Sequence, residues 1–124
     1  MSPPWNHLLS SPTQRAGLAA EQVALDYLLS RGLRPIARNY RVKLGELDLV
    51  MAQGGELVFV EVRRRAGDAF GGAAASVTAS KRARVRRAAQ AFLAERYGDR
   101  RWPPVRFDVV AIEGDRLHWI AGAF

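Results

Sequence analysis

Apolar residues follow a helical period in two segments of the chain. The first predicted helix covers residues 14–31 and ends at Gly32, a residue type that is frequent at helix C-termini. Its apolar positions are Leu18, Leu25, Leu28 and Leu29. The second predicted helix runs from about Ala79 to Tyr97 and is followed by Gly98. Two amphipathic helices are therefore expected.

Five other segments have the apolar content and the alternation of β-strands. They are RPIARNYRV (34–42), GELDLVM (45–51), ELVFVEVRR (56–64), VRFDVVAI (105–112) and RLHWIAGAF (116–124). The Gly54-Gly55 dipeptide separates the second strand from the third and accepts the positive φ angles of a tight hairpin turn. Gly114 marks a second turn, between the last two strands.

The order of these elements predicts the topology. A long helical connection between the third and fourth strands favours a parallel pair, whereas the short turns favour antiparallel pairs. We therefore predict one α/β (α+β) domain over residues 14–124, with a mixed five-stranded sheet, two main helices and the order αβββαββ. Residues 1–13, which include three prolines, are predicted to form a tail, and the Gly- and Ala-rich residues 66–76 a loop.

Three carboxylates interrupt the second and third predicted strands: Glu46, Asp48 and Glu61. With a two-residue loop at Gly54-Gly55, the register places Asp48 directly opposite Glu61 and Glu46 opposite Arg63. One face of the hairpin is then wholly apolar, and its residues are Leu47, Leu49, Met51, Val58, Val60 and Val62. A carboxylate taken out of water needs a partner, because burying its bare charge costs several kcal/mol or more.

Two explanations of the Asp48–Glu61 pair remain open. Opposed side chains lie ~5 Å apart at Cβ, and two like charges there repel unless a cation or a proton lies between them. A bound metal ion would supply that cation. Alternatively, Arg41, Arg63 or Arg64 neutralises the pair at an edge of the sheet, without any ligand.

Two charged residues lie on helix faces where apolar residues are expected. Glu21 falls on the stripe formed by Leu18, Leu25 and Leu28, unless Gln22 or Val23 carries the stripe and Glu21 lies at its margin. Lys81 shares a face of the second helix with Val77, Val85, Ala88 and Phe92. Its ammonium group either emerges beside the sheet or extends to solvent, as lysines at helix starts commonly do.

Composition limits the classes of site. The chain has 124 residues, of which 48% are hydrophobic, and this suits one compact domain. Disulfides and thiolate metal sites are excluded because there is no cysteine, and the two histidines are too few for a histidine-rich site. Any metal site must therefore use carboxylates, which favours Mg²⁺ or Mn²⁺.

The charge balance suits a polyanionic partner. Nineteen Lys and Arg residues against twelve Asp and Glu residues give a net charge of +7, although only two of the nineteen are lysines and a general bias towards arginine would also produce it. Basic residues cluster in KRARVRR (81–87) and RRR (63–65). No apolar run is long enough to span a bilayer, and no signal peptide is evident, so we expect a cytoplasmic protein with no membrane contact.

The strand motifs resemble those of a known family. GELDLV and VFVEVRRR, preceded by GLAAEQVALDYLLSRG and followed by the basic helix from Lys81, resemble the YraN family of small bacterial proteins. That family resembles archaeal Holliday junction resolvases and the restriction-endonuclease-like nuclease superfamily, and the match runs from about Gln14 to the C-terminus. The resemblance implies a restriction-endonuclease-like core and metal-dependent hydrolysis of structured or branched DNA.

The resemblance also implies roles for individual residues. Nucleases of this superfamily carry Asp, a spacer and then Glu-x-Lys; Asp48 and Glu61 match the two carboxylates and would hold Mg²⁺ or Mn²⁺. Glu21 matches the helical acid of resolvase-like members. Arg63 takes the lysine position and, because arginine stays protonated, it can bind the scissile phosphate but cannot accept a proton. Three alternatives then remain open: Lys81 takes over the positioning role of the missing lysine, the metal alone lowers the pKa of water, or the protein binds without cutting.

The predicted catalytic residues are Glu21, Asp48, Glu61, Arg63 and Lys81. The residues expected to contact nucleic acid are Arg64, Arg65, Lys81, Arg82, Arg84, Arg86 and Arg87. Three functions remain open: a Mg²⁺-dependent endodeoxyribonuclease, a non-catalytic nucleic-acid-binding module with a nuclease-like fold, and a structural or protein-interaction domain whose carboxylates only pair with arginines. The sequence also leaves open whether the nucleic acid is DNA or RNA and whether the protein forms a homodimer.

Overall fold

The computed structural model describes residues 12–64 and 77–124, with side chains from residue 16 onward. The elements follow the predicted order. They are α1 (Pro12–Ser30), β1 (Arg34–Val42), β2 (Gly45–Gln53), β3 (Glu56–Arg64), α2 (Ala79–Tyr97), β4 (Val105–Glu113) and β5 (Arg116–Ile120). Helix α1 starts at Pro12, two residues before the predicted start. The rest of the predicted tail, residues 1–11, and the predicted loop at 66–76 lie outside the described residues.

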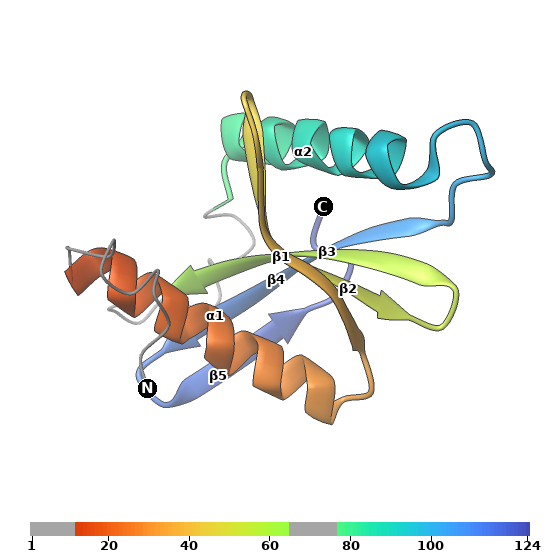
Figure 1. Ribbon diagram of the computed structural model, residues 1–124. Coiled ribbons are helices and arrows are strands. Elements are labelled where there is room, and N and C mark those ends of the chain that lie inside the picture. Colours follow the sequence, from red (N-terminus) through yellow and green to blue (C-terminus); the bar gives the residue numbers. More distant parts are fainter. Residues whose placement is uncertain (1–11, 65–76) are drawn as a thin grey trace, which may run out of the picture.

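The mixed five-stranded sheet is confirmed. Its strand order is β1-β2-β3-β4-β5, with β3 and β4 parallel and the other neighbours antiparallel. Figure 1 shows α1 and α2 on opposite faces of the sheet, and each helix covers its own apolar core. This α+β arrangement is consistent with the predicted nuclease-like core.

The buried stripe of α1 differs from the predicted one. Ala20, Ala24 and Leu28 are buried against the sheet, whereas Leu29 is 41% exposed. The stripe therefore repeats every four residues, and two of its three members are alanines, which allow the helix to pack closely on the strands. Glu21 lies beside this stripe, at its margin, and neither Gln22 nor Val23 carries it, because both are exposed.

The β1–β2 hairpin leaves the sheet partway along its length. Pairing between β2 and β3 ends at Leu49 and Val60, and Asn39, which lies opposite Asp48 in the β1–β2 register, has a φ angle of 53°. Asparagine is one of the few residue types that adopt this left-handed conformation readily. Figure 1 shows the hairpin rising from this point towards α2.

The bend corrects two features of the predicted hairpin. Leu47 does not share a face with Leu49 and Met51: it packs into the core beneath α2, while the other two pack into the core beneath α1. Glu46 does not face Arg63, because this part of β2 has already left β3. The predicted register holds only from Leu49 to the turn, since strict alternation assumes an unbent strand.

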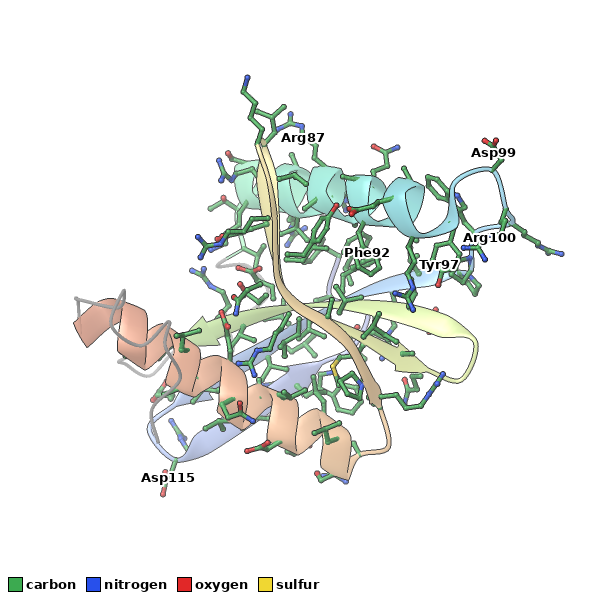
Figure 2. All side chains as sticks on the ribbon, in the orientation of Figure 1. Arg87, Phe92, Tyr97, Asp99, Arg100 and Asp115 are labelled. Atoms are coloured by element: carbon green, nitrogen blue, oxygen red, sulfur yellow. The ribbon has the colours of Figure 1, made fainter. Side chains whose placement is uncertain are left out.

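The raised tip of the hairpin packs on α2. The Tyr40 ring meets the Phe92 ring edge to face, with the centroids 5.3 Å apart, and the Tyr40 hydroxyl donates to Glu95 Oε2 at 2.7 Å. Figure 2 shows Phe92 pointing from α2 towards the sheet. At Gly45 the backbones are so close that a Cβ atom would overlap the Arg84 carbonyl oxygen. Glycine is required there because no other residue lacks a Cβ.

A buried carboxylate on β4 ties the C-terminal strands together. Asp108 is fully buried and accepts hydrogen bonds from Arg106 Nε at 2.8 Å, Trp119 Nε1 at 2.9 Å and the Gly122 backbone N–H at 2.9 Å. Arg106 NH2 also donates to it at 2.9 Å. The Arg106 guanidinium pairs with the charge of Asp108, and both carboxylate oxygens accept hydrogen bonds. Asp108 therefore has a structural role.

We expect Gly45→Ala to destabilise the protein, because the added methyl group would push the hairpin tip away from α2. Overpacking of this kind costs roughly 1–3 kcal/mol, measurable as a lower free energy of unfolding in urea. Gly55→Ala is the matched control, since a Cβ at Gly55 meets nothing within 4 Å. Equal stability of the two variants would contradict the packing of the hairpin tip on α2.

Candidate active site

Asp48 and Glu61 lie together where the hairpin leaves the sheet, as the hairpin register predicted. The β2–β3 pairing ends one residue before them, at Leu49 and Val60, and Asp48 Oδ2 accepts a hydrogen bond from the Val62 backbone N–H at 2.9 Å. The Asp48 carboxylate therefore replaces the backbone acceptor that a continued strand pairing would supply. Glu61 is buried, with only 4% of its surface exposed.

Lys81 pairs with Glu61. Its Nζ lies 3.1 Å from Glu61 Oε1, and the lysine side chain remains 39% exposed, whereas the glutamate side chain is 5% exposed. The ammonium group thus emerges beside the sheet, which is the first of the two alternatives that the sequence left open. Among the described residues, neither Asp48 nor Glu61 forms a salt bridge with Arg41, Arg63 or Arg64. Arg41 pairs with Glu46 instead (Nε–Oε2 3.4 Å).

Burial is the largest cause of the raised pKa values of both carboxyl groups. Burial is the largest cause of the raised pKa of Asp48, and the Val62 N–H opposes it. Burial, followed by the charge of Asp48, raises the pKa of Glu61 from 4.5 to about 7, even though Lys81 and Arg63 act in the opposite direction. The neighbouring cations therefore do not fully compensate the two negative charges.

Glu21 approaches Asp48 from α1, on the other face of the sheet. Burial and the charge of Asp48 raise the pKa of Glu21 from 4.5 to about 6, while a hydrogen bond with Asn39 lowers it. Within the described residues, Glu21 Oε1 is buried and has no hydrogen-bond partner. The predicted helical acid thus lies close to Asp48, and one of its oxygens is buried without a partner among the described residues. Sequence analysis missed Asn39, which the alternation pattern does not distinguish.

A cavity of about 290 Å³ opens beside Glu61 at the N-terminus of α2. We call it the acidic cavity, after Glu46 and Glu61. It is lined by Glu46, Glu61, Thr78, Ser80, Lys81, Arg84 and Val85. Thr78 caps the helix, because its hydroxyl accepts from the Lys81 backbone N–H at 3.2 Å. Sequence analysis missed Thr78 and Ser80 as site residues, although a threonine directly before a predicted helix is a recognised N-cap signal.

The predicted basic residues separate into different environments. Arg63 lies near Glu61, with its Nε buried and without a partner in the described residues, and Arg64 is exposed at the end of β3. Arg84 lines the acidic cavity together with Lys81. Arg65 lies outside the described residues.

The remaining arginines of α2 turn away from the cavity. Arg82 and Arg86 lie over the ring of Phe124, at 5.3 Å and 5.4 Å from its centroid. Figure 2 labels Arg87 on the outer side of α2, next to the hairpin tip. The cluster that is continuous in the sequence is therefore not one patch, and contacts of these three arginines with nucleic acid stay predictions.

The donor set suits a small divalent ion. Mg²⁺ is commonly held by one or two carboxylates together with water and phosphate oxygens, and Asp48 and Glu61 offer two adjacent carboxylates. Within the described residues, no group of three or more His, Cys, Asp and Glu side chains is arranged to hold a metal ion. A metal site here would therefore depend on these two residues, with the remaining ligands from water or substrate.

The chain is similar to a family of bacterial proteins. Residues 20–112 match the uncharacterised protein family UPF0102. A UPF0102 protein of Bordetella parapertussis is 56% identical over 118 residues, covering 92% of this chain and 66% of that protein. One of Cupriavidus taiwanensis is 56% identical over 112 residues, covering 90% and 83%, and one of Halorhodospira halophila is 51% identical over 115 residues, covering 93% and 90%. Neither described helix is long and apolar enough to cross a membrane.

We expect Glu61→Gln to stabilise the protein above pH about 7. Because the pKa of Glu61 is raised in the folded state from 4.5 to about 7, the native protein binds more protons than the unfolded chain between these two pH values. Its stability therefore falls as pH rises from 4.5 to about 7, and the loss is complete above that pH. Glutamine removes this loss, although losing the Lys81 pair offsets part of the gain. One pKa unit corresponds to about 1.4 kcal/mol, so the net gain should be on the order of 1 kcal/mol.

Thermal melts of both proteins across this pH range measure the effect. The gain should shrink towards pH 4.5, where Glu61 of the parent is protonated. Asp115→Asn, which alters an exposed carboxylate on the turn before β5, is the control and should retain the parent's pH profile. A lower melting temperature for Glu61→Gln at high pH would mean that the charged Lys81–Glu61 pair stabilises the fold.

Proposed function

This chain belongs to the UPF0102 family, the YraN family that its strand motifs resemble, and we propose that it is a metal-dependent endonuclease acting on structured or branched DNA. One observation carries the proposal: two adjacent carboxylates, Asp48 and Glu61, are held out of water with raised pKa values beside an open cavity. Because the charged forms of these carboxylates are disfavoured in the free protein, the arrangement suits a site that binds a cation.

Asp48 and Glu61 would hold Mg²⁺ or Mn²⁺. A divalent ion in such a site activates water for attack on phosphorus and stabilises the charge of the reacting phosphate. Glu21 would accept a proton from water at its unpartnered Oε1, and its pKa of about 6 suits a general base near neutral pH.

The N-terminus of α2 supplies the proposed phosphate site. Thr78, Ser80, Lys81 and Arg84 all line the cavity, and the first N–H groups of a 19-residue helix favour anions. Lys81 Nζ and the Arg84 guanidinium would bind phosphate oxygens of the backbone, without reading the sequence. Arg64, Arg65, Arg82 and Arg86 remain candidates for phosphates farther along the duplex.

The position of Lys81 bears on the departure at Arg63. In the superfamily motif a lysine follows the second carboxylate by two residues, and here that position holds arginine, which stays protonated. Lys81 reaches Glu61 from α2 at 3.1 Å, which supports the interpretation that it supplies the missing lysine from another element. Arg63, with a buried Nε that lacks a partner in the described residues, would then bind the scissile phosphate.

Arg63 also favours a second candidate function, a nucleic-acid-binding module that does not cut. If Lys81 stays paired with Glu61, no residue at the lysine position can accept a proton, because Arg63 stays protonated. The protein would then bind phosphate without hydrolysing the DNA. The purely structural interpretation is less well supported. Structural ion pairs lower carboxyl pKa values, whereas those of Asp48 and Glu61 are raised.

We expect Asp48→Asn to abolish Mg²⁺- or Mn²⁺-dependent cleavage of four-way, flap or duplex DNA and to leave DNA binding equal or tighter. The substitution removes a proposed metal ligand and a negative charge near the phosphate. Its melting temperature without metal should not fall, because the charged form of Asp48 is disfavoured in the fold. Asp115→Asn, on the exposed turn before β5, is the matched control.

Two other outcomes would contradict the nuclease proposal. DNA binding by a parent protein that never cleaves would favour the binding module. A marked loss of melting temperature in Asp48→Asn, with no metal binding by the parent, would favour the structural role.

We expect Arg84→Ala to weaken DNA binding and to flatten its salt dependence. Each phosphate contact contributes about −0.9 to the log–log slope of affinity against salt concentration, so losing one contact should reduce the slope by about that amount. Arg34→Ala, exposed at the start of β1, is the matched control. Fluorescence anisotropy with labelled duplex over a salt series gives both slopes. Identical slopes would show that the cavity arginine does not contact the backbone.

A further inference from the structure

A second cavity lies on the other side of the hairpin tip. Its volume is about 570 Å³, and its walls come from the β1–β2 turn, from the outer side of α2 and from Trp102, which follows that helix. The residues that carry its chemistry are Lys43, Leu44, Arg87, Ala91, Ala94 and Trp102. No described residue lines both this groove and the acidic cavity.

The packing of Gly45 separates the two sites. Gly45 lies against the Arg84 carbonyl and Ala88, so the hairpin crosses α2 at this level. The helical residues of the acidic cavity, 78–85, come before the crossing, and those of the groove, 87–94, come mostly after it. A ligand in the groove therefore contacts a surface of its own.

The groove exposes large apolar side chains. Leu44 is 58% exposed and Trp102 is 40% exposed. The Trp102 indole N–H donates to the Gly98 carbonyl at 3.0 Å, which fixes the ring and leaves its apolar surface at the groove. Ala91 and Ala94 form a shallow floor that allows close approach. Exposed apolar side chains gathered in a concave site are typical of surfaces that bind a partner.

The charges at the rim indicate the chemistry of that partner. Lys43 and Arg87 are the only charged residues that line the groove among those described, and neither forms a salt bridge with a described residue. An occupant with carboxylates beside its apolar side chains would complement them. A second copy of this chain is disfavoured, because it would bring two proteins of charge +7 together at cationic rims.

We propose that this groove binds a short acidic segment of another protein, in which apolar side chains alternate with aspartate or glutamate. The apolar side chains would pack on Leu44, Trp102 and the alanine floor. The carboxylates would pair with Lys43 and Arg87 at the rim, where they set specificity and speed association. This proposal does not depend on nuclease activity.

Synthetic peptides test the proposal with the full-length chain. The probe is a fluorescently labelled peptide in which leucine or phenylalanine alternates with aspartate or glutamate. Two comparison peptides replace either its acidic residues with lysine or its apolar residues with alanine. Anisotropy titrations should show saturable binding of the first peptide and at least roughly tenfold weaker binding of the other two. Equal binding of all three, or no binding, would overturn the proposal.

Substitutions locate the binding surface. Leu44→Ala and Trp102→Ala should each weaken binding of the acidic peptide roughly tenfold, and the double variant Lys43→Glu, Arg87→Glu should favour the lysine peptide. Leu29→Ala and Arg34→Glu, which alter exposed residues elsewhere, should bind like the parent. Melting curves verify that each variant is folded. If Trp102→Ala is unfolded, Leu44→Ala alone carries the test, because Leu44 is the more exposed of the two residues.

Other occupants give different results. Loss of single-stranded DNA affinity in Leu44→Ala and Trp102→Ala, with no effect on the peptide, would overturn the proposal in favour of nucleic acid. Concentration-dependent dimers in sedimentation that disappear in Leu44→Ala would overturn it in favour of a second copy of the chain.

Discussion

The departure of the β1–β2 hairpin from the sheet determines the rest of the structure. Where β2 separates from β3, the Val62 backbone N–H would lose its acceptor, and a buried N–H without a partner is costly. Asp48 supplies the acceptor, with its Oδ2 at 2.9 Å. The left-handed backbone at Asn39 turns the opposite strand at the same level. One carboxylate therefore ends the strand pairing and also forms the centre of the candidate site.

The same departure brings charged groups from both faces of the sheet together. Glu61 points to the α2 side, where Lys81 meets it, and Glu21 comes from α1 on the other side. In an unbroken sheet the strands would separate these faces. In this cluster the nearby cations do not fully compensate the negative charges, as the raised pKa values of its three carboxyl groups indicate. Such unfavourable arrangements are concentrated at functional sites, whereas Asp108, fully paired on β4, illustrates a buried carboxylate that only stabilises the fold.

Features that depend on local sequence patterns were predicted, and features that depend on contacts between distant segments were not. Alternation and turn glycines are local, so they predicted the limits of β1, β3 and α2 and the register near Gly54. Continued one residue beyond Leu49 and Val60, where the pairing ends, this register also predicted that Asp48 lies beside Glu61. Helical spacing left Lys81 either beside the sheet or in solvent, and the structure has it beside the sheet. The bend at Asn39 has no periodic signature, because an asparagine in a strand pattern reads as an ordinary polar residue. The predicted positions of Leu47 and Glu46 were therefore wrong. Thr78 carries a local N-cap signal, but its place in the cavity, like that of Ser80 and of the partners of Asp108, depends on tertiary packing that no local pattern encodes.

The fate of the basic segment 81–87 follows from helix geometry. Successive residues of an α-helix are rotated by about 100°, so neighbouring cations in the sequence point to different sides. Lys81 and Arg84 face the acidic cavity, Arg82 and Arg86 cover the ring of Phe124, and Arg87 borders the apolar groove. The five positive charges of this segment are thus divided among separate environments instead of forming one binding face. Because Gly45 is packed against α2 between the cavity and the groove, a shift of the hairpin tip on the helix would change the walls of both sites.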